Sequence, residues 1–243
     1  MPEETGLQPV RQIAAHELAV EQIRRSLDLG KFRPGERLPA ERDLAEMLDV
    51  SRNTVRAAVA VLEHEGRVSV RRGRGGGFLV LEPALDRAQL RFDLQRNEAE
   101  VRDAFDFRVI VESGAARLAA ERRRTADMPR LAKLVRQMGD IVERARHEDS
   151  PTHITEFKLL DSAFHLGIAQ VSGNDQLVEA VAQARSRMYL PVSAVFSHID
   201  LNANDHHSEI LAAITDKDPD QAAALMTAHI NETRDALQAL LKL

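Results

Sequence analysis

Four residues in the C-terminal half, Asp161, His165, His207 and His229, are of types that bind metal ions. Asp161 and His165 are four positions apart in a segment with helical periodicity, which puts them one turn apart on one face. Both fall on the shoulder of that helix's apolar stripe, and His207 and His229 align with the apolar faces of two later helices. We therefore expect one carboxylate and three imidazoles to point toward the same interior from three helices.

The chemistry of this set favours a divalent cation. Burial of an unpaired carboxylate is costly, and a cation would offset that cost. Carboxylate and imidazole donors together suit zinc, our first choice, and also nickel, manganese or iron. A single inward histidine is more often a hydrogen-bonded core residue than a ligand, so the alternative is a buried hydrogen-bond network. Four inward groups together favour the metal site.

Two arginines form a second candidate site. Arg52 and Arg56 lie one turn apart on a predicted helix that Ser51 would cap, and Asn53 lies further round on its exposed side. Arginine can donate two hydrogen bonds to guanine, asparagine can pair with adenine, and the methyl group of Thr54 can touch thymine. This pattern suits the major groove of DNA. The alternative is an ordinary helical hairpin with solvated arginines.

The elements around these arginines follow the order of a winged helix-turn-helix. Pro39 is expected at the first position of the helix before the turn, where its missing N–H is harmless. Residues 68–70 and 78–80 read as two short strands, joined by the basic, glycine-rich turn 71–77. Arg72 in this turn, the wing, could reach phosphates or enter the minor groove.

Residues 38–68, LPAERDLAEMLDVSRNTVRAAVAVLEHEGRV, resemble the DNA-binding signature of the GntR family, in which LPSER and SRxxVR recur. The resemblance covers roughly residues 11–80. Ala40 stands where the family commonly has Ser or Thr, and the missing cap would cost about 1 kcal/mol. The resemblance implies DNA-contacting roles for Arg42, Arg52, Asn53, Thr54, Arg56, Arg72 and Gly73.

Three later segments, DSAFH at 161–165, HSEILAAI at 207–214 and AALMTAH at 223–229, resemble the C-terminal FCD ligand-binding domain of the FadR-like branch. In metal-binding members these positions coordinate the ion, and the fatty-acyl-responsive member lacks the full set. The resemblance therefore implies a metal-dependent acid sensor whose ligands are Asp161, His165, His207 and His229.

The same resemblance matches Arg108 to an effector-binding arginine. Arg108 shares a helix face with Val101, Phe105 and Ala119, and an inward guanidinium requires an anion, for which the carboxylate of a small effector is suited. The alternative is a salt bridge within the helix between Arg108 and Glu112.

The basic charge is concentrated where DNA contact is expected. The 243-residue chain has a net charge of −5, yet residues 52–74 carry six Arg against Glu63 and Glu65. Phosphate contact requires such a local patch rather than a basic whole protein. There is no Cys, the first ten residues do not resemble a signal peptide, and no apolar run is long enough to cross a membrane. These features predict a cytoplasmic protein.

The predicted fold is mainly α. Residues 1–10 are expected to be disordered, 11–82 to form the winged helix-turn-helix, and 83–243 to form an all-α bundle of six or seven helices for effector binding and dimerisation. Glu82-Pro83 is the expected linker. Helices are predicted at 14–29, 39–48, 52–65, 85–95, 98–122, 127–147, 152–171, 175–188 (before a break at Pro191), 204–215 and 219–241.

The favoured function is a bacterial transcription regulator that binds operator DNA as a homodimer and senses a small carboxylate at a metal. A metalloenzyme with a DNA-binding appendage is one alternative, although no nucleophile motif or convincing general base accompanies the ligands. A purely metal-responsive regulator is the other, and Arg108 argues against it.

Overall fold

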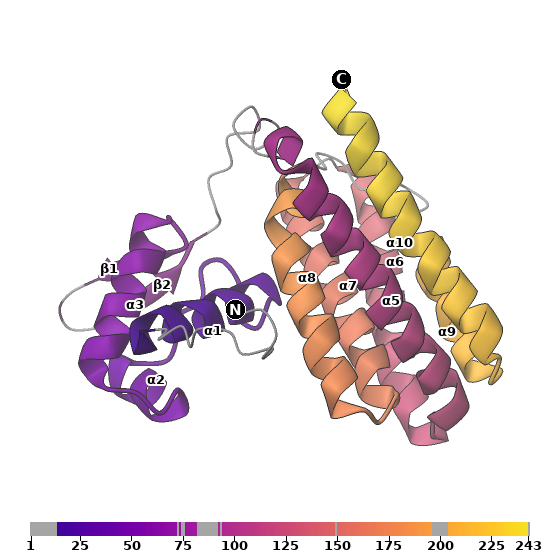
Figure 1. Ribbon diagram of the computed structural model, residues 1–243, viewed down its shortest axis with the longest axis horizontal. Coiled ribbons are helices and arrows are strands. Elements are labelled where there is room, and N and C mark those ends of the chain that lie inside the picture. The colour runs from indigo at the N-terminus through magenta and orange to yellow at the C-terminus, as the bar shows by residue number, and fades with distance from the viewer. Residues whose placement is uncertain are drawn as a thin grey trace, which may run out of the picture. The chain divides into compact units, whose positions relative to one another are not determined.

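The computed structural model describes residues 14–71, 73, 76–81, 92, 94–148, 150–195 and 204–242. The chain divides into two compact units, a small N-terminal one and a larger helical one (Figure 1). The expected disorder of residues 1–10, the linker at Glu82-Pro83 and most of the helix predicted at 85–95 lie outside the described residues. Each unit has its own hydrophobic core.

The N-terminal unit is a winged helix-turn-helix. Its two strands pair antiparallel, with Val68 opposite Val80 and Arg71 opposite Gly77, and Arg37 forms an isolated bridge to Leu79. Its elements are α1 (Ala15–Asp28), α2 (Glu41–Met47), α3 (Arg52–His64), β1 (Val68–Arg71) and β2 (Gly77–Val80).

Local chemistry sets the ends of these helices. Ser51 caps α3 as predicted, because its hydroxyl accepts the N–H of Thr54 at 3.1 Å. Gly30 ends the turn after α1 with a φ of 68°, a left-handed conformation that glycine adopts without strain. The prediction for Pro39 was wrong: α2 begins at Glu41, and Ala40 is its N-cap with extended backbone and no side-chain cap bond. Pro39 therefore precedes the helix.

Burial fixes which face of α3 is free for other contacts. Val55, Ala58, Val59 and Leu62 form its inner stripe and are almost completely buried. They pack in one cluster with α1, α2 and the strands. The opposite face of α3, which carries the arginines, is therefore left to solvent.

The second unit is an all-α bundle. Its helix α5 packs most extensively against α10 and also contacts α7, α8 and α9 (Figure 1). It is therefore a central helix of the bundle. The elements are α5 (Glu98–Arg122), the short 3-10 turn η2 (Thr125–Asp127), α6 (Met128–His147), α7 (Pro151–Val171), α8 (Asp175–Val195), α9 (Asp205–Thr215) and α10 (Pro219–Lys242).

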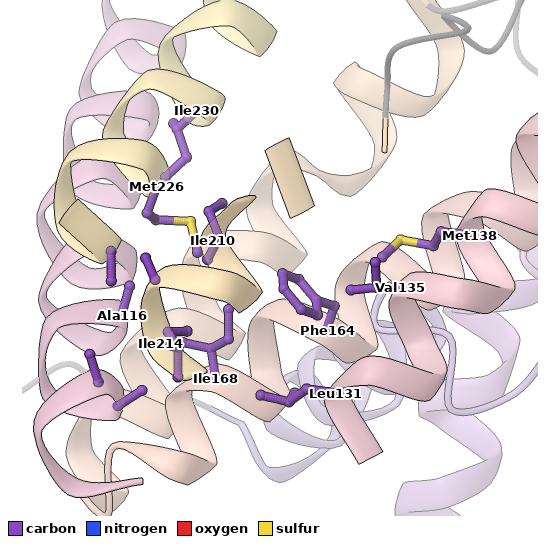
Figure 2. Close-up of a cluster of buried hydrophobic side chains, with 14 of the residues drawn as sticks. Ala116, Leu131, Val135, Met138, Phe164, Ile168, Ile210, Ile214, Met226 and Ile230 are labelled. Atoms are coloured by element: carbon purple, nitrogen blue, oxygen red, sulfur yellow. The ribbon is translucent and has the colours of Figure 1, made fainter. Parts of the chain in front are cut away.

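An aliphatic core holds this bundle together. Phe164 and Ile168 of α7 lie between α6 and α9, where Ile210 and Ile214 meet them (Figure 2). These four side chains are at most 1% exposed. Complete burial of such a side chain stabilises the fold by about 1.5–3 kcal/mol. The core fixes α7 and α9, which also carry three of the candidate ligands.

The predicted break at Pro191 was wrong, because α8 continues to Val195. A proline inside a helix removes one ladder hydrogen bond, that of its own missing N–H, and the turns on either side can still hold the helix. The other helix boundaries within the bundle agree with the prediction to within one residue. Six α-helices, α5 to α10, are described in this unit, and the described residues 92 and 94–96 ahead of α5 are also helical.

Candidate functional site

The four predicted metal ligands come together in the middle of the helical unit. His165 Nε2 lies 3.3 Å from Asp161 Oδ1, and His207 Nε2 lies 3.0 Å from the same oxygen. His229 completes the group, and the ligand atoms of all four residues lie within 4.8 Å of one another. Helices α7, α9 and α10 supply them, which agrees with the expected convergence of three helices. Their role as ligands stays a prediction.

The imidazole rings also pack against one another. The ring centroid of His229 lies 4.6 Å from that of His207 and 5.2 Å from that of His165. Phe164 packs its ring edge-on to His207, with centroids 5.3 Å apart. Four of the buried polar nitrogens without a well-aligned hydrogen bond belong to this region: both ring nitrogens of His165, Nδ1 of His207 and Nε of Arg185.

Two further charged residues, Glu112 and Arg185, complete the cluster, and the sequence did not identify them as site residues. The carboxylate of Glu112 lies 2.5 Å from His165 Nδ1. Arg185 donates from Nη1 to Glu112 at 3.3 Å and from Nη2 to Asp161. Both side chains are buried. Their burial could have been inferred from sequence by their helical alignment with apolar residues, such as the alignment of Arg185 with Val178 and Val181.

The charges and protonation states of this cluster follow from its burial. Burial alone raises the pKa of Asp161, but Arg185 and His165 outweigh it and hold that pKa well below its ordinary value. Burial likewise raises the pKa of Glu112, but Arg108, His165 and Arg185 bring it well below its ordinary value. Both carboxylates are therefore ionised at neutral pH.

Two of the site histidines, His207 and His229, have pKa values shifted in the direction that metal binding requires. Burial lowers the pKa of His207. Burial, together with the neighbouring His207 and His165, lowers the pKa of His229 well below its ordinary value. Both imidazoles are therefore neutral at pH 7, with a lone pair free for a Lewis acid.

Arg108, the predicted effector-binding residue, lies in the same interior. Its Nε donates to Glu112 Oε1 at 2.7 Å, and the two side chains are only 6% and 1% exposed. The guanidinium carbon also lies 5.8 Å from the ring centroid of Phe105. The alternative salt bridge is therefore present. It engages Nε, and binding of an effector by the terminal nitrogens stays a prediction.

In the N-terminal unit, one carboxylate holds the two predicted base-reading arginines. Glu41 of α2 accepts from Arg52 Nε with one oxygen and from Arg56 Nε with the other, each at 2.7 Å. The hydrogen bond from Arg56, despite partial desolvation and with help from Arg52, lowers the pKa of Glu41. The arginine side chains are 61% and 59% exposed, whereas that of Glu41 is 20% exposed. Glu41 thus engages only Nε of each arginine, and Arg56 Nη1 donates to Asn53 Oδ1 at 3.4 Å.

The other predicted DNA-contacting residues vary in their surroundings. Asn53 is exposed and lies 3.4 Å from Arg56, whereas Thr54 is half-buried and shares a 2.8 Å hydroxyl contact with Ser51. Arg42 is 82% exposed and pairs with Asp43. Gly73 has a φ of 98° and its carbonyl accepts the Gly76 N–H, which forms a tight turn at the wing. Arg72 lies outside the described residues.

Two family models match this chain. Residues 103–232 match the FCD domain, and residues 16–78 match the model described as bacterial regulatory proteins, gntR family. Together they cover the helical bundle and the winged helix-turn-helix.

Sequence relatives span most of the chain. It is 32% identical to the Uxu operon transcriptional regulator of Escherichia coli, over 85% of this chain and 80% of that protein. It is 30% identical to the HTH-type transcriptional regulator RmpR of Mycobacterium gastri, over 90% of this chain and 78% of that protein. The transcriptional regulator LutR of Bacillus subtilis is 28% identical over 86% of this chain and 94% of its own length.

Solved structures share the fold. McbR/YncC of Escherichia coli superposes with a TM-score of 0.54 at 21% identity, covering 94% of this chain and 99% of that one. A transcriptional regulator from a Rhodococcus species superposes with a TM-score of 0.51 at 21% identity, covering 92% and 97%. Within the described residues no helix has the length and apolar character that crossing a membrane requires.

Proposed function

The chain belongs to the GntR family of bacterial regulatory proteins and carries an FCD domain, and on that premise we propose that it is a cytoplasmic regulator that senses a small carboxylate at a metal ion. It binds operator DNA as a homodimer through the winged unit. Its relatives are transcription regulators rather than enzymes, so the metalloenzyme alternative has no support from them. The observation that carries the proposal is the convergence of Asp161, His165, His207 and His229.

The cluster fits a divalent cation on three grounds. Its ligand atoms lie within 4.8 Å of one another. Small side-chain movements would bring each of these atoms to about 2.0–2.2 Å from one shared ion, the distance at which nitrogen and oxygen bind zinc. The ionised carboxylate and the lowered pKa values of His207 and His229 give the protonation states of ligands. His165 Nε2 is buried and lacks an aligned hydrogen-bond partner, so its lone pair could bind a cation. A bound ion would supply positive charge and open coordination positions.

The charge of the cluster supports an anionic effector. Arg108 and Arg185 balance Glu112 and Asp161, so a divalent cation would leave the interior with an excess of positive charge. Such a charge is costly to bury unless an anion accompanies it. A carboxylate can place one oxygen at the ion and pair the other with the terminal nitrogens of Arg108. A regulator that responds to metal alone would leave this charge unpaired.

The exposed arginines of α3 support sequence-specific DNA binding. Arg52 and Arg56 project from the helix that enters the major groove in helix-turn-helix proteins, and Asn53 lies beside them. Arg42, Thr54, Gly73 and Arg72 of the wing are the further proposed contacts. One winged module reads a short half-site, so we expect a homodimer and a roughly palindromic operator.

A direct test begins with metal analysis of protein purified without chelator, followed by calorimetric titration of candidate carboxylates with and without zinc. We expect about one zinc per chain and carboxylate binding only in its presence. His207→Ala and His229→Ala should lose both, whereas Arg108→Ala should keep zinc and lose the carboxylate. If wild-type protein binds none of zinc, nickel, manganese or iron, the four residues form a hydrogen-bond network and the sensor proposal fails.

Sedimentation tests the assembly. The protein at micromolar concentration without DNA should sediment as a dimer, and a monomer would contradict this part of the proposal.

A further inference from the structure

We propose that Glu112 is a positioning residue that couples the metal ligand His165 to the anion-binding Arg108. This inference rests on the proposed function and extends it to a residue outside the predicted ligand set. Glu112 Oε1 accepts from Arg108 Nε at 2.7 Å, and its Oε2 lies 2.5 Å from His165 Nδ1. One buried carboxylate thus contacts both parts of the proposed sensor.

On the metal side, Glu112 selects which nitrogen of His165 is available. A carboxylate beside Nδ1 stabilises the tautomer that carries its proton there, and metal-bound histidines usually donate their second ring N–H to such a partner. When an ion binds, the proton stays at Nδ1 and Nε2 supplies its lone pair to the ion. Nε2 is the nitrogen that lies 3.3 Å from Asp161 Oδ1. The contact between Nδ1 and Glu112 is short but poorly aligned for a hydrogen bond. A small rotation of the His165 ring toward an ion would improve the alignment of this hydrogen bond.

On the effector side, Glu112 holds Arg108 without occupying the two terminal nitrogens of the guanidinium. The bond engages Nε, which leaves the two terminal nitrogens for paired hydrogen bonds to a carboxylate. The guanidinium is also fixed over Phe105. An arginine held in this way has less side-chain freedom to lose when a ligand binds.

Arg185 supports the link from the other side. It donates from Nη1 to Glu112 Oε2 at 3.3 Å and from Nη2 to Asp161. The carboxylates of α5 and α7 are therefore bridged by one guanidinium of α8. A movement of His165 or Asp161 toward an ion would reach Glu112, and through it Arg108, by direct contacts.

The test compares Glu112→Gln with wild type by zinc calorimetry, with and without acetate as the carboxylate probe. Loss of such a second partner typically weakens metal affinity about 10- to 100-fold, and we expect that loss here. Acetate should tighten zinc binding to wild type and have little further effect on the variant. Glu121→Gln, the same change at an exposed position of α5, is the control and should behave as wild type.

The outcomes distinguish failure of the proposed function from failure of the coupling through Glu112. If wild type binds no zinc, the proposed function fails. If wild type binds zinc and Glu112→Gln matches it in both affinity and acetate effect, the coupling is overturned. A variant that binds acetate more tightly than wild type would also overturn it, because Glu112 would then be a competitor for Arg108 rather than its support.

A measurement on wild type avoids any dependence on the variant's folding. Imidazole nitrogen NMR should find His165 protonated at Nδ1 in the zinc-free protein, with Nε2 shifting when zinc is added. Binding of zinc through Nδ1 would overturn the proposed position of Glu112.

Discussion

At the scale of single residues, Arg52 and Arg56 have the exposure needed to read bases. Each changed to Ala should weaken operator binding about 5- to 150-fold and relax the preference at one operator position, because a guanine would lose its paired donors. Binding assays against a set of single-base operator variants measure both effects. Wild-type affinity and selectivity in both variants would show that this face of α3 does not read the operator.

Glu41 leads to a second prediction, because its carboxylate both positions the two arginines and offsets their charge. Glu41→Gln should bind random DNA at least as tightly as wild type, since a negative charge near the phosphates is removed. It should bind the operator less tightly, since the arginines lose their common anchor.

The measured quantity is the ratio of operator to random-duplex affinity at a fixed salt concentration, which should fall. Glu46→Gln removes the same charge from an exposed position of α2 and should preserve the ratio. An equal change in both variants would assign the effect to net charge alone.

Acid should destabilise the metal-free helical unit. The lowered pKa of His229 lies below the ordinary 6.5, so the unfolded chain binds more protons as pH falls below about that value. Stability contributed by this residue is present above pH 6.5 and is lost on acidification. The Tm in EDTA should therefore fall between pH 7.5 and 5.5, and His229→Asn should reduce that fall. A variant with the wild-type pH dependence would contradict this account of His229.

The residues of the site were predictable to different degrees from sequence. Asp161, His165, His207 and His229 lie on or beside apolar stripes, so helical periodicity alone directs them inward. Glu112 and Arg185 lie on such stripes as well, but a charge near a helix face is usually solvated. Their burial depends on opposite charges contributed by other helices, and one sequence does not reveal those pairings.

At the scale of elements, the caps of α2 and α3 predict opposite effects of two small substitutions. Ser51→Ala removes the acceptor of the Thr54 N–H and should destabilise α3 by about 1 kcal/mol. Ala40→Ser supplies a cap that α2 lacks and should stabilise it by a similar amount. Hydrogen exchange of peptides from each helix measures the change. Equal protection of α3 in wild type and Ser51→Ala would contradict the assigned cap.

The element boundaries show where local sequence rules succeed and fail. The start of α3 was predicted from its capping residue Ser51, and the ends of most bundle helices were predicted from changes of periodicity. The two errors involve Pro39 and Pro191. Proline is compatible with the residue before a helix, its first turn or, at a cost, its interior. Packing against neighbouring elements decides which of these three positions a proline takes, and the local sequence does not reveal that packing.

At the scale of the whole molecule, the separate cores of the two units predict separate responses to metal. A ligand that binds only the folded state stabilises the unit that contains its site. Calorimetric unfolding with zinc at 100 times its Kd should raise the stability of the helical unit by about 2.7 kcal/mol. The transition of the winged unit should not move. His207→Ala should abolish the shift and still bind operator DNA, and a zinc-dependent shift of both transitions would contradict separate responses.

The order of the helices along the chain adds a consequence for folding. Asp161 and His229 belong to α7 and α10, which are far apart in sequence, and α10 packs along α5, where the bundle begins. A bound ion would therefore join distant parts of one chain, as a removable crosslink does, and closing a long loop reduces the freedom of the unfolded chain. Because α10 supplies one ligand, the complete set can assemble only after the helices α5 to α9 have been synthesised.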